Sequence, residues 1–258
     1  MRVAEPSVAG LRRIEEVMGI PVGIDVRDAG VDPAFVDRAF AWLRWADVTF
    51  STYRPDSAIS RMNAGTLALG DAAPEVREVL ARCEDLRART GGCFDVRARG
   101  ALDPSEFVKG WAIEAVAGML VAAGARNLCV HAGGDLCVRG ERSPGQPWRV
   151  GIQHPWRRDR VAAVLRTRGL AVATSGSYER GAHVVDPRTG RAPQGVASVT
   201  VLGADLATAD AYATAAFAMG VDGPAWTAGL EGYDALTILA DGRVLSTPGV
   251  AALRDQTA

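Results

Sequence analysis

The sequence predicts an α+β fold, with mixed or antiparallel sheets flanked by helices, because helical and strand-like patterns occupy different parts of the chain. Apolar residues recur mainly at helical spacing between Asp32 and Gly124, and they alternate in several runs after Asn127. The two patterns do not interleave regularly, as they would in a βαβ winding. A length of 258 residues is long for one domain and short for two, which predicts a single compact unit of two lobes spanning residues 1–258.

The first half of the chain is expected to hold one strand and three helices. Strict alternation of apolar residues predicts a half-buried strand over residues 20–26. Asp32 and Pro33 are typical of an N-cap and a first helical turn, so the first helix should begin there. Helical spacing predicts a second helix over residues 74–90 and a third within residues 103–124.

The second half is expected to be rich in strands. Alternating or buried-type runs predict strands near residues 128–130, 148–152, 170–174 and 199–201. The turn pair Asp241-Gly242 between two apolar runs indicates a hairpin near the C-terminus.

The Ala-rich segment from Asp205 to Gly220 predicts a helix with a capping aspartate at its start and a glycine at its end. Asp210 and Thr214 are four residues apart, so a carboxylate and a hydroxyl project from one face. Hard oxygen ligands with small neighbours suit Mg²⁺ that holds a phosphate. Such pairs are more often solvated or capping residues, so this helix alone does not establish a metal site.

Composition and charge exclude several classes of function. The formal net charge is -1 and no basic run stands out, so neither a nucleic-acid partner nor an anionic membrane surface is indicated. No run approaches the ~18 apolar residues of a membrane span. The N-terminus shows no signal-peptide pattern and no cysteine that could carry a lipid, which predicts a cytoplasmic protein as the sequence stands, although a trimmed export precursor would look the same.

Four polar loops are candidates for chemistry: the loop at Ser51, the turn at Lys109, the turn Gly133-Gly134-Asp135, and residues 174–190. Each has an ordinary explanation when taken singly. Gly133-Gly134-Asp135 is typical of a tight turn, Lys109 of a solvated first-turn lysine, and His183 of a half-buried histidine. Neither the GxGxxG nor the Walker-type phosphate-binding motif is present. The order of the motifs carries more information than any one of them.

Read in order, the chain contains FSTYRPDSxxSxxN, CFDV, DPSxxVKGW, AGGD, TSGxYERGxHVVDPRTG and DAYATA. This set resembles the ApbE family of FAD:protein FMN transferases and runs from about Met18 to Gly220. Residues 1–15 and 253–258 are expected to be peripheral to it. The resemblance implies binding of FAD with Mg²⁺ and transfer of its FMN half to a Ser or Thr hydroxyl of another protein, with release of AMP.

The resemblance also implies roles for individual residues. The metal would be held by Asp210, Thr214 and the backbone carbonyl of Val108, and His183 is the candidate catalytic base. Lys109 is expected to serve both catalysis and cofactor binding. The other expected cofactor contacts are Met18, Tyr53, Phe94, Asp95, Ser105, Trp111, Asp135, Val184 and Asp186.

Three positions depart from the family pattern. Glu106 replaces a frequent Gly, Trp111 a frequent Tyr, and Glu114 a frequent Asp. Glu106 is the departure with chemical consequences, because it adds a negative side chain near a diphosphate. Two opposite effects are open: weaker FAD binding, or recruitment of Mg²⁺.

Other readings of the same residues remain open. A Mg²⁺-dependent FAD diphosphatase would use the same site with water as the nucleophile and release free FMN and AMP. A non-catalytic FAD-binding protein would need neither the metal ligands nor a base. An unrelated α+β domain with chance motifs is the fourth reading. The chain contains no segment like the family's acceptor motif, so a transferase would act on another protein.

Overall fold

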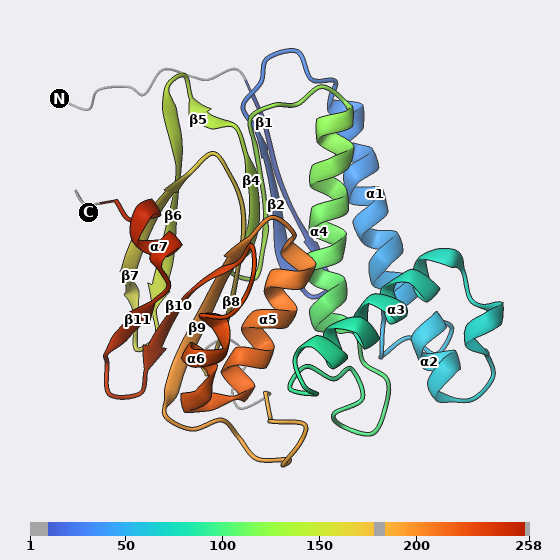
Figure 1. The fold of residues 1–258 in the computed structure, drawn as a ribbon. Helices are drawn as coiled ribbons and strands as arrows, with labels where there is room; N and C mark the ends of the chain where they lie inside the picture. Colours follow the sequence, from blue (N-terminus) through green and yellow to red (C-terminus); the bar gives the residue numbers. More distant parts are fainter. Residues whose placement is uncertain (1–9, 178–183, 256–258) are drawn as a thin grey trace.

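A large antiparallel sheet organises the molecule. The computed structural model describes residues 10–177 and 184–255 of the chain. Within these residues an eight-stranded sheet has the order β1-β2-β3-β4-β8-β9-β10-β11, and a three-stranded sheet has the order β5-β6-β7. Every neighbouring pair is antiparallel. The predicted α+β class with antiparallel sheets and flanking helices is confirmed (Figure 1).

The strands are β1 (Leu11–Val17), β2 (Ile20–Val26), β3 (Leu128–Ala132), β4 (Asp135–Arg139), β5 (Glu141–Ser143), β6 (Gln146–His154), β7 (Arg157–Thr167), β8 (Gly169–Gly176), β9 (Val196–Gly203), β10 (Asp234–Leu239) and β11 (Val244–Ser246). The helices are α1 (Pro33–Phe50), α2 (Ala58–Asn63), α3 (Pro74–Arg89), α4 (Ser105–Ala122), α5 (Leu206–Ala218), α6 (Gly223–Thr227) and α7 (Pro248–Leu253).

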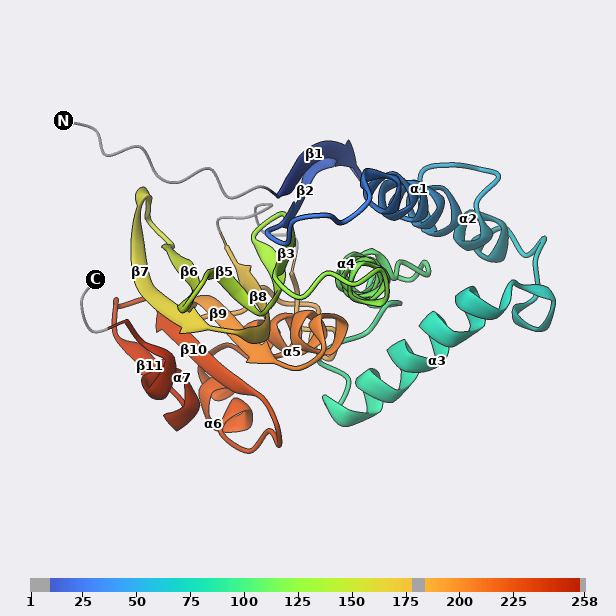
Figure 2. The ribbon, with the colours of Figure 1, turned by 90° about the horizontal axis from the view of Figure 1, so that it is seen from above.

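The elements form layers around the large sheet. Figure 2 shows α1, α4 and α5 on one side of it, and the small sheet with α7 towards the other side. The helical side carries the main hydrophobic core. A second cluster lies between the two sheets and includes Ile152, Leu165, Leu202 and Leu236. Every residue of β9 is buried as a result. Helix α5 is therefore positioned against a strand that is covered on both faces.

Capping residues in the sequence mark the starts of α1 and α5. The Asp32 side chain accepts a hydrogen bond from the Ala34 amide at 2.9 Å, and Asp205 accepts one from the Thr208 amide at 2.8 Å, so both predicted N-caps are confirmed. The predicted hairpin at Asp241-Gly242 joins β10 to β11. The elements that were not predicted are β1, β4, β5, β7, α2 and α7. Strand β1 and the first half of β7 are mostly exposed and polar, so they lack the apolar alternation of a half-buried strand.

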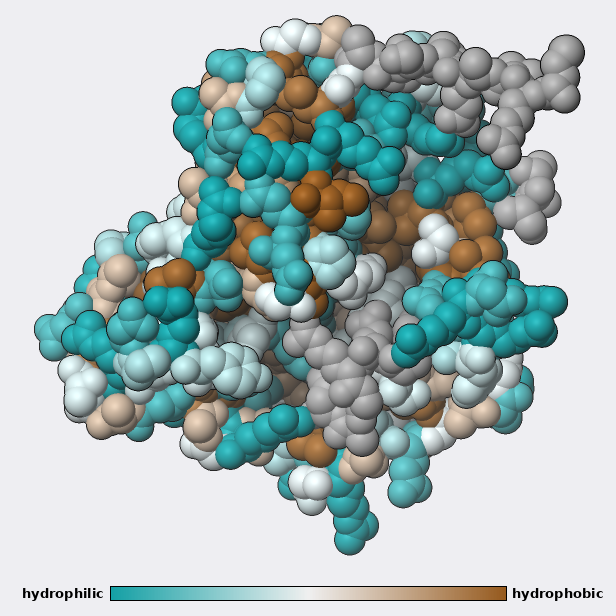
Figure 3. Space-filling view, turned by 180° about the vertical axis from the view of Figure 1, so that it is seen from behind, coloured by the Kyte–Doolittle hydropathy of each residue, from teal (hydrophilic) through white to brown (hydrophobic). Residues whose placement is uncertain are grey.

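The outer surface mixes the two kinds of side chain. Seen from behind, hydrophobic patches are separated by hydrophilic residues (Figure 3). Such a mixture is ordinary, because apolar atoms contribute more than half of most protein surfaces. Among the described residues, no helix is long and apolar enough to cross a membrane. The cytoplasmic location stays a prediction.

Gly110 allows α4 and α5 to approach closely. A Cβ atom at this position would lie 2.9 Å from the Ala207 Cα and 3.0 Å from the Leu206 carbonyl oxygen, both of them backbone atoms of α5. Backbone cannot move aside as a flexible side chain can, so only glycine fits this contact. The approach is what brings the polar side chains of α4 and α5 together.

We expect Gly110→Ala to lower the free energy of unfolding by about 1–3 kcal/mol, because the added methyl group overpacks the helix contact. Gly118→Ala on the same helix is the matched control, since nothing lies within 4 Å of its added Cβ. That control should be neutral or stabilising by up to about 1 kcal/mol. Urea denaturation of both variants checks the prediction, and equal effects would contradict it.

Asp28 ties the start of β3 to the segment after β2. Its carboxylate accepts hydrogen bonds from the Arg126 and Asn127 amides at 2.8 and 2.7 Å and from the Asn127 side chain. Burial raises the pKa of Asp28, but these donors outweigh it and hold the pKa below the ordinary 3.8. Its stabilising effect is therefore present above that value and is lost as the pH falls through the lower folded-state pKa.

We expect Asp28→Ala to lower the free energy of unfolding by about 2 kcal/mol at neutral pH. The difference from the parent protein should shrink in acid below the ordinary pKa, where the parent carboxylate is protonated too. Denaturation curves across this pH range check both statements. A difference that stays constant with pH would contradict the assigned cause.

Candidate active site

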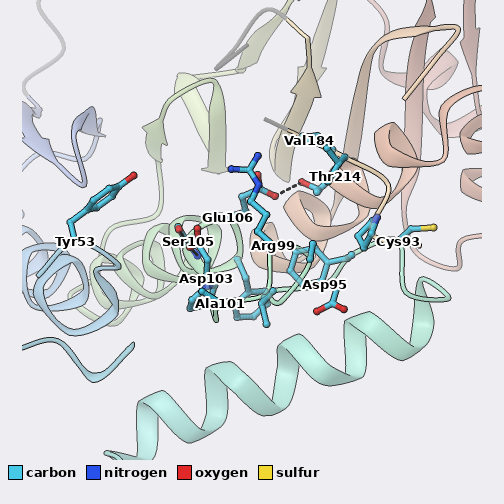
Figure 4. A pocket seen from close by; sticks show the side chains of 17 residues that line it. Tyr53, Cys93, Asp95, Arg99, Ala101, Asp103, Ser105, Glu106, Val184 and Thr214 are labelled. Atoms are coloured by element: carbon cyan, nitrogen blue, oxygen red, sulfur yellow. Dashed lines mark hydrogen bonds between the residues drawn. The ribbon is translucent and has the colours of Figure 1, made fainter. Parts of the chain in front are cut away.

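A pocket opens where α4 and α5 meet the loops that follow α1 and α3. It encloses about 270 Å³, and Figure 4 shows its side chains converging from several elements. It is lined by Tyr53, Cys93, Phe94, Asp95, Val96, Ala98, Arg99, Ala101, Asp103, Pro104, Ser105, Glu106, Phe107, Val184, Val185, Pro187 and Thr214.

Lys109 joins two buried carboxylates behind this pocket. Its ammonium contacts the Asp135 Oδ2 atom and lies 3.5 Å from the Asp210 Oδ2 atom. Asp135 is completely buried and also accepts a hydrogen bond from the Thr174 amide at 3.0 Å. Three segments far apart in the sequence, on α4, β4 and α5, thus bring opposite charges together in the interior.

The Asp210 carboxylate is buried, which is unfavourable for an ionised group. The residue is 2% exposed, and its Oδ2 atom has the long 3.5 Å contact with the Lys109 ammonium but no close hydrogen bond within the described part of the chain. Burial raises the pKa of Asp210 well above its ordinary value, and the Lys109 charge only partly opposes this. A second positive charge near Asp210 would relieve the cost of burying the carboxylate.

Thr214 links α5 to the first turn of α4. Its hydroxyl lies 3.2 Å from Glu106 Oε2 and donates to it, and it also lies 3.2 Å from the Ser175 hydroxyl. Figure 4 shows the Glu106–Thr214 contact inside the pocket. Because Asp210 and Thr214 share one face of α5, the buried charged cluster and the pocket are neighbours.

Comparison with known proteins agrees with this arrangement. The model of the ApbE family matches residues 18–103 and 97–237. The chain belongs to the ApbE family. The resemblance of the ordered motifs is therefore confirmed, and the match extends beyond Gly220 to residue 237.

Several relatives are named FAD:protein FMN transferase. One from Rhodobacter capsulatus is 33% identical over 230 residues, which cover 86% of this chain and 41% of the relative. Another, from Treponema pallidum, is 30% identical over an alignment that covers 86% of this chain and 71% of the relative. The aligned residues cover 41% of the Rhodobacter relative and 39% of a relative from Vibrio cholerae, so the sequence matches reach less than half of these two proteins.

Solved structures share the fold. The flavin transferase ApbE from Vibrio cholerae superposes with a TM-score of 0.84 at 24% identity, covering 95% of this chain and 99% of that one. The ApbE protein from Thermotoga maritima gives a TM-score of 0.85 at 22% identity, covering 96% and 100%. At these identities the likeness shows the fold.

The predicted metal ligands of the family are compatible with the geometry. Asp210 and Thr214 lie side by side on α5, and Val108 is buried on α4 directly before Lys109. In residues 10–177 and 184–255, no three His, Cys, Asp or Glu side chains form a metal cage. Mg²⁺ does not require one, because it binds through one or two carboxylates together with substrate phosphates. The Oδ2 atom of Asp210 is buried, and its contact with the Lys109 ammonium is long, at 3.5 Å, so this atom could also hold such a cation.

The predicted cofactor contacts fall into two groups. Tyr53, Phe94, Asp95, Ser105 and Val184 line the pocket. Tyr53 is 96% exposed, so the faces of its ring are open to a planar ligand.

The other predicted contacts lie outside the lining. Met18 occupies the turn between β1 and β2 with a φ of 58°, and Asp135 is engaged by Lys109. Trp111 is buried, with its ring centroid 5.3 Å from that of Trp42. Their roles as cofactor contacts stay predictions.

Asp186 is held in place by its own loop. The Arg188 guanidinium donates to both of its carboxylate oxygens, at 3.0 and 3.1 Å, and this pairing holds the pKa of Asp186 below its ordinary value. The neighbouring Val185 and Pro187 line the pocket. The prediction for His183 falls outside the described residues.

Sequence reasoning missed several residues of the pocket. Asp103 accepts a hydrogen bond from the Ser105 amide at 3.1 Å and so orders the entry to α4. The turn residues Asp103 and Pro104 before a helical pattern were a signal for this polar turn. Arg99 gave no comparable signal, because only the packing of the loop after α3 brings it to the pocket. Ser175, whose hydroxyl meets that of Thr214, belongs to the TSGxYERGxHVVDPRTG motif, which the sequence did single out.

We expect Lys109→Met to lower the free energy of unfolding by about 3–5 kcal/mol, because it leaves Asp135 and Asp210 buried without their cation. Adding Asp135→Asn should recover part of this loss by removing one of the two charges. Chemical denaturation of the single and double variants tests both statements. Equal stability of parent and Lys109→Met would show that the ion pair does not offset the burial of these carboxylates.

Proposed function

We propose that this protein transfers the FMN moiety of FAD to a Ser or Thr hydroxyl of an acceptor protein and releases AMP. The observation that carries the proposal is the meeting of Lys109, Asp210 and Thr214 beside a pocket that is lined by five of the predicted flavin contacts. The names of the curated relatives support the same activity. We further propose that residues 1–258 act as one unit of two lobes.

The reaction is a displacement at phosphorus. The acceptor hydroxyl oxygen forms a bond to the phosphorus of the FMN half, and the phosphoanhydride bond to the AMP phosphate breaks. AMP leaves with the bridging oxygen, and the hydroxyl proton passes to a base, for which His183 is the candidate. The balance needs no oxidant or reductant, because the flavin ring is carried and not reduced.

Different residues of the chain would have different roles in this reaction. Asp210, Thr214 and the Val108 carbonyl would hold Mg²⁺, which supplies positive charge to the phosphoryl oxygens when bound. Lys109 adds a fixed positive charge beside the same position, and its two carboxylate partners keep it there. Tyr53 offers an open aromatic face for the isoalloxazine ring at one end of the pocket.

The test is a transfer assay with purified protein, FAD, Mg²⁺ and a protein that carries the family's Ser/Thr acceptor motif. We expect in-gel flavin fluorescence of the acceptor and a mass gain of one FMN, both abolished by EDTA. Free FMN and AMP without an adduct, even with several acceptors, would instead establish a diphosphatase. FAD that stays intact would overturn both activities and leave a flavin-binding protein.

A further inference from the structure

We propose that the small sheet β5-β6-β7 is the surface on which the acceptor protein docks, and that this partner presents an acidic face to it. The inference rests on the proposed function, which requires a protein partner, and adds the place and the charge of the contact. It concerns a part of the molecule that lies outside the pocket and contributes none of the predicted site residues.

Positive charge is concentrated in this sheet. Residues 142–168 contain seven arginines and one aspartate, a net charge of +6, whereas the whole chain carries -1. The two hairpins bring these arginines into one small sheet and its turns. All seven are exposed: Arg142, Arg149, Arg157, Arg158, Arg160, Arg166 and Arg168. The rest of the chain has an excess of negative charge, so the positive surface is a local property of the small sheet.

Four of the seven arginines have no acidic partner in the molecule. Arg149 lies 3.0 Å from Asp255, and Arg168 lies 2.9 Å from Glu141. The arginines that form no ion pair with any described residue are Arg157, Arg158, Arg160 and Arg166. An exposed charge of this kind adds little to the stability of the fold. These side chains are therefore available to a partner.

Two arginines face each other across the sheet at a cost in stability. Arg149 and Arg166 are directly opposite in the register of β6 and β7, and both are exposed. Like charges directly opposite each other destabilise a pair of strands. Asp255 offsets one of the two charges. An acidic side chain of a partner would offset the other, so the pair is better explained by binding than by folding.

An exposed aromatic side chain lies at the tip of the β6–β7 hairpin. Trp156 is 53% exposed, and Val161 on the same hairpin is 57% exposed. The Trp156 amide donates to the His154 Nδ1 atom at 3.3 Å, and the two rings pack edge to face with centroids 5.6 Å apart. Tryptophan and arginine are the residues that most often dominate the binding energy of protein interfaces. The hairpin therefore offers an anchor as well as charge.

The hairpin tip lies towards the end of the molecule that holds the pocket. A single residue, Arg168, joins β7 to β8, and side chains of both strands belong to the core cluster between the two sheets, so β7 runs back along β8. The end of β8 reaches the pocket, since the Ser175 hydroxyl lies 3.2 Å from that of Thr214. The start of β7 is therefore near the pocket end of the molecule (Figure 1). A protein docked on the hairpin can extend a segment towards the pocket.

Arginine and tryptophan together also suit an anionic membrane surface or a nucleic acid. The proposed reaction favours a protein, because it requires an acceptor protein and neither of the other two. The excess negative charge on the rest of the chain also opposes an extended polyanion, which would reach beyond the small sheet.

A pair of acceptor proteins tests the inference. Both carry the family's Ser/Thr acceptor motif on one carrier domain, and they differ only in a cluster beside the motif, with glutamates in one and glutamines in the other. At low ionic strength we expect the parent protein to use the glutamate acceptor with a kcat/KM at least about tenfold higher, because complementary charge speeds encounter. The preference should disappear as salt screens the exposed charges.

Charge reversal on the hairpin provides the matched variants. Arg158→Glu/Arg160→Glu should abolish or reverse the preference and leave kcat at saturating acceptor unchanged. Arg12→Glu/Arg38→Glu, at exposed positions on β1 and α1, makes the same change of net charge and should keep the preference. Trp156→Ala should raise the KM for both acceptors severalfold. Thermal melting of each variant checks that folded proteins are compared.

The outcomes separate this inference from the proposed function. If the parent transfers FMN to both acceptors without a preference, or if Arg158→Glu/Arg160→Glu keeps the preference, docking on the small sheet is overturned and the proposed function stands. If the parent transfers FMN to neither acceptor, the proposed function fails and the inference fails with it. If the double variant keeps the preference but loses binding to phosphatidylserine vesicles or to a DNA duplex, the surface serves a membrane or a nucleic acid instead.

Discussion

Replacing Asp210 with alanine should reduce Mg²⁺-dependent FMN transfer by at least about a hundredfold. Loss of an outer-shell partner already costs about 10–100-fold in metal affinity or activity, and a direct ligand should cost no less. The effect should appear at every Mg²⁺ concentration that saturates the parent protein. Initial rates of acceptor flavinylation over a Mg²⁺ titration measure it.

Two further variants separate loss of the ligand from loss of structure. Asp210→Asn keeps the volume of the side chain and removes the charge whose burial is costly, so it should fold at least as stably as the parent without metal. Thr214→Ser keeps the hydroxyl and should retain activity, whereas Thr214→Val should lose it. Unchanged Mg²⁺ dependence in Asp210→Ala would place the metal elsewhere.

His183→Ala should slow transfer by about 10²–10⁴-fold, the usual contribution of a general base. A hydroxyl attacks phosphorus poorly until its proton is removed, and neutral imidazole accepts a proton near pH 7. The chain directly after this position, Val184 and Val185, lines the pocket. Single-turnover rates of FMN transfer at saturating FAD and Mg²⁺ measure the loss.

The controls for His183→Ala test whether the residue acts as a base, and not only whether it is needed for transfer. Binding of FAD and Mg²⁺ should be nearly unchanged in His183→Ala, because a base acts on the attacking hydroxyl and not on the cofactor. Added imidazole should restore part of the rate if the missing group is a base. Near-normal transfer without imidazole would remove His183 from the mechanism.

Local patterns in the sequence determined the elements that present the site. The capping residues Asp32 and Asp205 fixed two helix starts, since a cap depends on neighbours only two or three residues away. Helical spacing alone placed Asp210 and Thr214 on one face. The family was inferred from six ordered motifs, and the match over residues 18–237 confirms this inference.

Only the tertiary structure decided which of these groups meet. The Lys109 contacts with Asp135 and Asp210 and the Glu106–Thr214 hydrogen bond join residues that are far apart in sequence. They form because Gly110 lets α4 and α5 approach to backbone contact. The periodicity of apolar residues indicates which face of a helix is buried, but not which element packs against that face. The excess of carboxylates around Lys109 could therefore be found only from the packing of α4 and α5.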